Sequence, residues 1–184
     1  MTVPFGPTLR QPDGYSCGAS CVVVARMLRS PTSTPAVRPL ASGFAHEVLD
    51  THRRLTGLGD ALGRGQLPWP RHLGTPPWAV ARALSRIEGR RYGLHLTRHD
   101  PEAAYDLARP WVEAGRAGHP VALYVGNRFL PRHVVLALEV ADDGSLRCYD
   151  PASGTLRPAS RWAFEHTELH LGGWTHPWFV VAPS

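Results

Sequence analysis

Cys17 is the residue of this sequence best placed to act as a nucleophile. It follows a turn-forming segment, residues 12–16 (PDGYS), and it opens an apolar stretch with three small residues, 18–20 (GAS). The free N–H groups and the dipole at the start of a helix favour a thiolate. We therefore expect a reactive thiol at a helix start, with room beside it for a substrate.

A base for this thiol must come from elsewhere in the chain, and His133 is the candidate because it opens the strand-like run HVVLALEV. Residues 141–144 (ADDG) are typical of a hairpin turn. The register that this turn sets places His133 opposite about Ala152, with Asp150 one diagonal step away on the same face. Spacing therefore predicts a nucleophile, a base and an orienting carboxylate in Cys17, His133 and Asp150.

Acyl transfer also needs a hydrogen-bond donor for the oxyanion that forms at the attacked carbonyl. Gln11, six positions before Cys17, has a side-chain amide that can serve, together with the backbone N–H of the cysteine. Gln11 could instead be a solvated loop residue, and Asp150 could be a turn aspartate that caps its own backbone. We favour the catalytic interpretation because all four residue types occur together.

The other two cysteines, Cys21 and Cys148, are expected in the core, since free cysteine is among the most buried residue types. A resolving thiol for redox control is the alternative for Cys21, which lies one helical turn after Cys17. The C-x3-C spacing has no matching second pair, so we expect neither a metal site nor a cofactor. An odd count of three cysteines indicates reduced thiols.

Composition is that of a globular protein, and we expect one domain over residues 1–184. The chain is 43% hydrophobic and 19% charged, which excludes disorder, collagen and coiled coil. Its net charge is +5, and all of its Lys and Arg positions are arginines. These arginines are scattered along the sequence and do not form a cluster. We therefore expect no nucleic-acid partner.

No apolar run approaches the length of a membrane-spanning helix, so we expect no membrane partner. The first residues, MTVPFGPTLRQPDG, lack the apolar core of a secretory signal peptide, and we expect a cytoplasmic protein. We also expect that no pro-segment precedes Gln11.

Hydrophobic periodicity and turn residues predict an α+β fold. Helices are expected at 16–28, at about 41–55, from an N-cap at Thr75 to Ile87, and from Asp100 to about Ala114, with a helical turn at 160–166. Strands are expected at 92–98, 120–126, 132–140, 145–149 and 177–182. The nucleophile helix would belong to a helical layer packed on a C-terminal antiparallel sheet. The loops 57–77 and 126–132 are expected to flank the site.

Three pieces carry a family resemblance: QPDGYSCGASC (11–21), GHPVALYVGNRFLPRHVVLALEV (118–140) and YDPASG (149–154). In this order they resemble the bacteriocin-processing, double-glycine leader type of papain-like cysteine peptidase. The resemblance implies a papain-like fold with Gln11 in the oxyanion hole, Cys17 as nucleophile, His133 as base and Asp150 as its orienter.

The best-known members of that family are fused to membrane transporters, whereas this chain has no membrane or nucleotide-binding segment, so we expect a stand-alone domain. Its substrate would be a peptide or another acyl compound. Two alternatives stay open from the residues alone. One is a catalytically silent peptide-binding module of the same fold. The other is an acyltransferase or deamidase that acts on a protein or on a non-peptide substrate.

Overall fold

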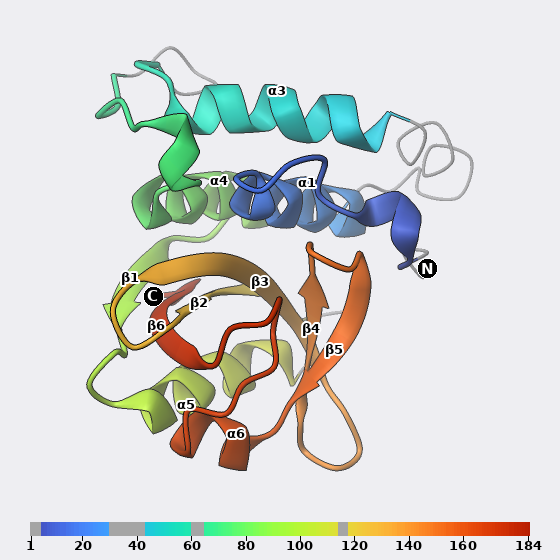
Figure 1. The fold of residues 1–184 in the computed structure, drawn as a ribbon, viewed down its shortest axis with the longest axis vertical. Coiled ribbons are helices and arrows are strands. Elements are labelled where there is room, and N and C mark those ends of the chain that lie inside the picture. Colours follow the sequence, from blue (N-terminus) through green and yellow to red (C-terminus); the bar gives the residue numbers. More distant parts are fainter. Residues whose placement is uncertain (1–4, 30–42, 60–64, 114–117) are drawn as a thin grey trace.

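A six-stranded antiparallel sheet is the centre of the computed structural model, which describes residues 5–29, 43–59, 65–113 and 118–184 (Figure 1). The strand order is β1-β6-β2-β3-β4-β5. The strands are β1 (Tyr92–Leu96), β2 (Val121–Gly126), β3 (Pro131–Val140), β4 (Leu146–Asp150), β5 (Thr155–Ala159) and β6 (His176–Pro183). The helices are α1 (Cys17–Arg29), α3 (Phe44–Thr56), α4 (Pro77–Glu88), α5 (Pro101–Val112) and α6 (Arg161–Glu165), with short 3-10 turns η1 (Pro7–Leu9) and η2 (Arg71–Leu73).

Helices cover both faces of this sheet. Figure 1 shows α1, α3 and α4 above the sheet and α5 and α6 below it, and a separate apolar core fills each side. Strand β2 is buried along its whole length, as its unbroken apolar run VALYV requires when both faces are covered. The α+β class and the packing of the nucleophile helix on the sheet are confirmed. The second helical layer is an addition to the prediction.

Most elements lie where the sequence predicts them, with three differences. Strand β5 was not predicted; it pairs with β4 at the edge of the sheet, where its proline is tolerated. Thr75 as the N-cap of α4 is wrong, because Pro76 occupies that position without a side-chain cap. The start of the second helix was expected near residue 41, which lies outside the described residues; α3 begins at Phe44.

None of the helices in the described ranges combines the length and the apolar character that crossing a membrane requires.

A buried carboxylate ties the ends of α1 and α4 to the segment before β2. The Glu88 side chain is 0% exposed and accepts hydrogen bonds from Arg29 at 2.9 Å and 2.5 Å. Its second oxygen also lies 2.7 Å from His119 Nδ1. Arg29 further donates to the carbonyl of Gly118 at 2.6 Å. This cluster therefore links the helical layer to the segment that leads into β2.

Replacing Glu88 with glutamine is expected to lower the free energy of unfolding by about 2 kcal/mol, since Arg29 then loses its anion in a partly buried setting. Urea denaturation measures the change. Glu113→Gln is the matched control, because its pair with Arg109 is exposed on both sides and should contribute less than about 0.5 kcal/mol. Equal losses in the two variants would contradict a structural role for the Glu88 cluster.

Candidate active site

The turn before α1 makes Cys17 the first residue of that helix. Asp13 Oδ1 accepts hydrogen bonds from the backbone N–H groups of Tyr15 and Ser16, both at 2.9 Å. The Ser16 carbonyl then accepts from the backbone N–H of Ser20 at 2.8 Å, which starts the helical pattern. N–H groups in the first turn of a helix have no carbonyl partner within it, so those around Cys17 can face an anion.

Gly18 allows a neighbouring segment to approach the start of α1. A Cβ at this position would lie 2.8 Å from the Cβ of Thr75. Thr75 is held in place by the Tyr124 hydroxyl, which donates to its carbonyl at 2.9 Å, and its own hydroxyl lies 3.2 Å from His52 Nδ1. The space beside Gly18 is therefore taken by packing and is not left for a substrate.

Cys21 joins α1 to the strand that carries His133. Its Sγ lies 3.5 Å from the carbonyl oxygen of Val134, and Cys21 and Cys148 are both 0% exposed, so their prediction as core residues is confirmed. Burial raises the pKa of the Cys21 thiol well above its ordinary value.

Within the described ranges, no group of three or more His, Cys, Asp and Glu side chains is placed to hold a metal ion.

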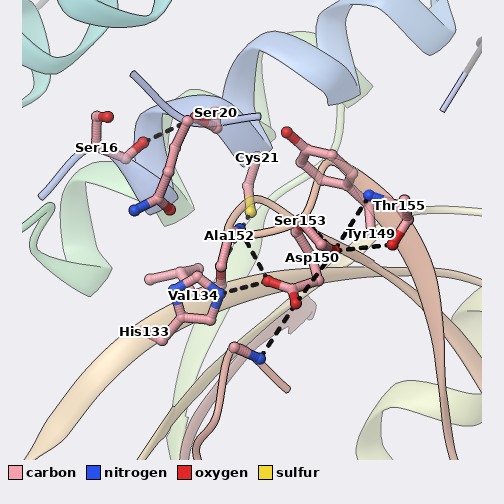
Figure 2. Close-up of polar contacts among 12 residues, drawn as sticks. Ser16, Ser20, Cys21, His133, Val134, Tyr149, Asp150, Ala152, Ser153 and Thr155 are labelled. Atoms are coloured by element: carbon pink, nitrogen blue, oxygen red, sulfur yellow. Dashed lines mark hydrogen bonds and ion pairs between the residues drawn. The ribbon is translucent and has the colours of Figure 1, made fainter. Parts of the chain in front are cut away.

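The predicted imidazole and carboxylate lie against each other near the ends of β3 and β4 (Figure 2). His133 Nε2 is 2.8 Å from Asp150 Oδ1, and the two residues are only 5% and 3% exposed. The pairing of Leu136 with Tyr149 matches the register predicted from the hairpin. Strand geometry therefore brings together two residues that are 17 positions apart in the sequence.

Asp150 accepts hydrogen bonds on both carboxylate oxygens. Besides His133, Oδ1 accepts from the backbone N–H of Ala152 at 3.0 Å, while Oδ2 accepts from the N–H of Gly172 at 3.2 Å and from the Ser153 hydroxyl at 3.4 Å. Burial alone would raise the pKa of this carboxyl, but the hydrogen bond from His133 and the backbone donors lower it below its ordinary value. Asp150 thus caps its own turn and also faces the imidazole as a carboxylate.

The surroundings of His133 favour its protonated form. Burial alone would lower its pKa, but the hydrogen bond to Asp150 and the electrostatic effect of Cys17 outweigh burial and raise the pKa to about 9. Because Asp150 occupies Nε2, Nδ1 is the ring nitrogen left to exchange a proton with the thiol. The structure therefore brings His133 and Asp150 into direct contact, and Cys17 lies close enough to the imidazole to influence its pKa.

Cys17 is a free thiol that is buried almost completely. It retains 4% of its surface exposed, whereas Cys21 and Cys148 retain none. A cavity of about 250 Å³ lies between α1, α3 and α4, but its lining includes neither Cys17 nor His133. This cavity is therefore separate from the candidate active site.

Gln11 is held against the turn that follows Asp150. Its backbone N–H donates to the Pro151 carbonyl at 2.9 Å, and its side-chain Nε2 donates to the Asp13 carbonyl at 2.7 Å. Its Oε1 is buried without a hydrogen-bond partner. An amide nitrogen carries two protons, so one remains for another acceptor. Its role in an oxyanion hole stays a prediction.

Gly172 is the residue of this site that sequence reasoning missed. It precedes β6, its backbone φ is 59°, and its N–H donates to Asp150. A Cβ at position 172 would lie 2.5 Å from His133 Cδ2 and 2.6 Å from His133 Nε2. The glycine doublet 172–173 is a turn signal in the sequence, but nothing local shows that the turn lies against the imidazole.

Of the comparisons with known proteins, the one with solved structures found a match. No family model matches the chain, and no curated protein matches it. Among solved structures the chain is similar to a peptidase domain, which is the class of protein that the sequence motifs resemble. That domain is from Streptococcus ComA, a bi-functional ABC transporter involved in a quorum-sensing pathway. The two share 16% sequence identity over 95% of this chain and 96% of that chain, with a TM-score of 0.47.

Proposed function

We propose that this chain is a cysteine-dependent enzyme that cleaves or transfers an acyl group from a peptide bond or another amide. The observation that carries the proposal is the buried His133–Asp150 hydrogen bond of 2.8 Å beside a thiol at a helix start. Nucleophile, base and orienting carboxylate come from α1, β3 and β4, which are rigid elements. Such a set serves nucleophilic catalysis.

In the first half of the reaction, the Cys17 thiolate attacks the carbonyl carbon of the substrate and forms a tetrahedral oxyanion. His133, protonated on Nδ1, donates that proton to the leaving nitrogen as the C–N bond breaks. The amine departs and a thioester remains on Cys17. Asp150 accepts from Nε2–H throughout, so it holds the ring in the orientation that each proton transfer needs.

In the second half, neutral His133 removes a proton from water or from an acceptor amine, which attacks the thioester carbon. The C–S bond then breaks and restores the ion pair of thiolate and imidazolium. Water as acceptor yields a carboxylic acid, and an amine yields a new amide. Hydrolysis and acyl transfer use the same residues and differ only in the acceptor.

Gln11 and the backbone N–H of Cys17 are the proposed donors to the oxyanion. The Gln11 amide is oriented by its hydrogen bond to the Asp13 carbonyl, which leaves its second N–H proton for the developing charge. The Cys17 N–H belongs to the first turn of α1 and has no partner within the helix. Free thiols at all three cysteines fit the reducing cytoplasm that we propose as the compartment.

The rival proposal is a peptide-binding module that has lost turnover. The intact set of Cys17, His133 and Asp150 favours the enzyme, since a binding module has no need of a buried imidazolium beside a thiol. Deamidation of a protein substrate would use the same residues as hydrolysis, with ammonia as the leaving group.

The two proposals predict different reactivity at Cys17. We expect iodoacetamide near neutral pH to alkylate Cys17 alone and faster than a free thiol, and p-nitrophenyl acetate to leave one acetyl group on that residue. Peptide mapping by mass spectrometry identifies the site, and Cys21 and Cys148 serve as internal controls because neither has exposed surface. Alkylation no faster than that of glutathione, without an acetyl adduct, would favour the binding module.

A further inference from the structure

The segment that covers the His133–Asp150 pair is fixed at several points. Leu169 and Leu171 are 0% exposed and belong to the core below the sheet. Leu171 forms an isolated bridge with Trp174, and the N–H of Thr175 donates to the carbonyl of Gly126 at 3.2 Å. Segment 169–175 is therefore anchored before and after the glycine doublet.

Gly172 contacts both members of the pair from this anchored segment. Its N–H donates to Asp150 Oδ2 at 3.2 Å. Its Cα lies so close to His133 that an added Cβ would come within 2.6 Å of Nε2, the atom that is hydrogen-bonded to Asp150. The ring therefore has Asp150 at its edge and the backbone of Gly172 directly beside it, and a side chain at position 172 cannot be accommodated without displacing one of them.

We propose that Gly172 is a positioning residue for the reaction: it acts through His133 and Asp150, holding the imidazole against the carboxylate and keeping water away from their hydrogen bond. The inference rests on the proposed function for its catalytic meaning, although the geometry does not depend on it. Removing water strengthens a hydrogen bond between charged groups. A backbone N–H directed at the second carboxylate oxygen also fixes which oxygen faces the ring.

The chain offers a matched control for this proposal. Gly172 and Gly173 both have left-handed backbones, with φ of 59° and 84°, so alanine strains the backbone at either position. A Cβ at Gly173 would meet nothing within 4 Å, whereas one at Gly172 would meet the His133 ring. The difference between Gly172→Ala and Gly173→Ala therefore isolates the contact with His133 from the cost of strain.

The experiment is an NMR titration of the His133 imidazole in the full chain, with the alkylation rate of Cys17 followed against pH in the same samples. In Gly172→Ala we expect the His133 midpoint to fall from near 9 by more than about one unit, and Cys17 alkylation near neutral pH to slow about tenfold. Gly173→Ala should keep both values, although urea denaturation should show the loss of stability that backbone strain alone causes. Equal midpoints in the two variants would overturn the proposal.

A measurement on the unaltered chain keeps the proposal testable if Gly172→Ala does not fold. The amide proton of Gly172 is bonded to Asp150, so its chemical shift should follow the titration of His133, while that of Gly173 should not. A Gly172 amide that ignores this titration would overturn the inference. If His133 responds as expected but Cys17 reacts no faster than a free thiol, the positioning role stands and the proposed function fails.

Discussion

Replacing His133 with alanine is expected to slow the alkylation of Cys17 near neutral pH by about 100-fold. In the proposed mechanism the imidazolium stabilises the thiolate of Cys17, and the influence of Cys17 is one of those that raise the pKa of His133 to about 9. Without the ring, no cation lies beside the sulfur to favour the thiolate, which is the reactive form of cysteine. The greater nucleophilicity of a more basic thiolate offsets part of this loss.

The pH dependence of alkylation distinguishes this explanation from a general loss of structure. In His133→Ala the rate should recover as the pH rises and the thiol ionises, so the variant approaches the unaltered chain at high pH. His46→Ala is the control, because that side chain is 82% exposed and should leave the rate unchanged. A neutral-pH rate in His133→Ala equal to that of the unaltered chain would refute the thiolate and imidazolium pair.

The candidate site could be predicted from the sequence to the extent that local rules determine it. Cys17 follows a turn in which Asp13 accepts hydrogen bonds from the backbone N–H groups of Tyr15 and Ser16. Such a turn depends on residues that are close together in the sequence. His133 and Asp150 lie on two strands of one hairpin, and their register is set by the turn at 141–144 together with the irregularity between Ala137 and Glu139. Short-range patterns therefore predict the pair of His133 and Asp150, whose Nε2 and Oδ1 atoms lie 2.8 Å apart.

The features that were missed depend on contacts between distant segments. Gly172 meets His133 because segment 169–175 is anchored by core leucines, and no local pattern identifies that partner. Thr75 precedes two prolines in a typical helix start, but its hydroxyl meets His52 instead of a backbone N–H of α4. Strand β5 contains Pro158, which disfavours a strand, and it forms because β4 offers an open edge.

Replacing Asp150 with alanine is expected to reverse the effect of the protein on the titration of His133. Burial, the largest single influence on that group, lowers its pKa, and in the intact site the carboxylate and Cys17 outweigh it. Without the carboxylate we expect the pKa of His133 to fall below its ordinary value of 6.5. The ring would then be neutral near pH 7 and could no longer protonate a leaving amine, so acyl transfer should fall by roughly 1000-fold.

The same change should alter how stability depends on pH. In the intact chain the folded-state pKa of about 9 exceeds the ordinary 6.5, so protonated His133 stabilises the fold fully below pH 6.5, and this contribution is lost as the pH rises through 9. In Asp150→Ala the folded-state pKa lies below the unfolded value, so stability is lost as the pH falls below about 6.5. Urea denaturation across this range measures both slopes, and parallel curves for the two proteins would contradict the assignment.

Asp150→Asn separates the charge of this residue from its hydrogen bond. Asparagine keeps an acceptor for His133 Nε2–H and for the Ala152 N–H, but its amide nitrogen would face the N–H of Gly172, a clash of two donors. We expect the ring to keep its orientation while its pKa falls toward or below 6.5, with acyl transfer between that of the alanine variant and the intact chain. If asparagine and alanine lower the rate equally, the negative charge matters and the orientation does not; if asparagine retains full activity, orientation alone is sufficient.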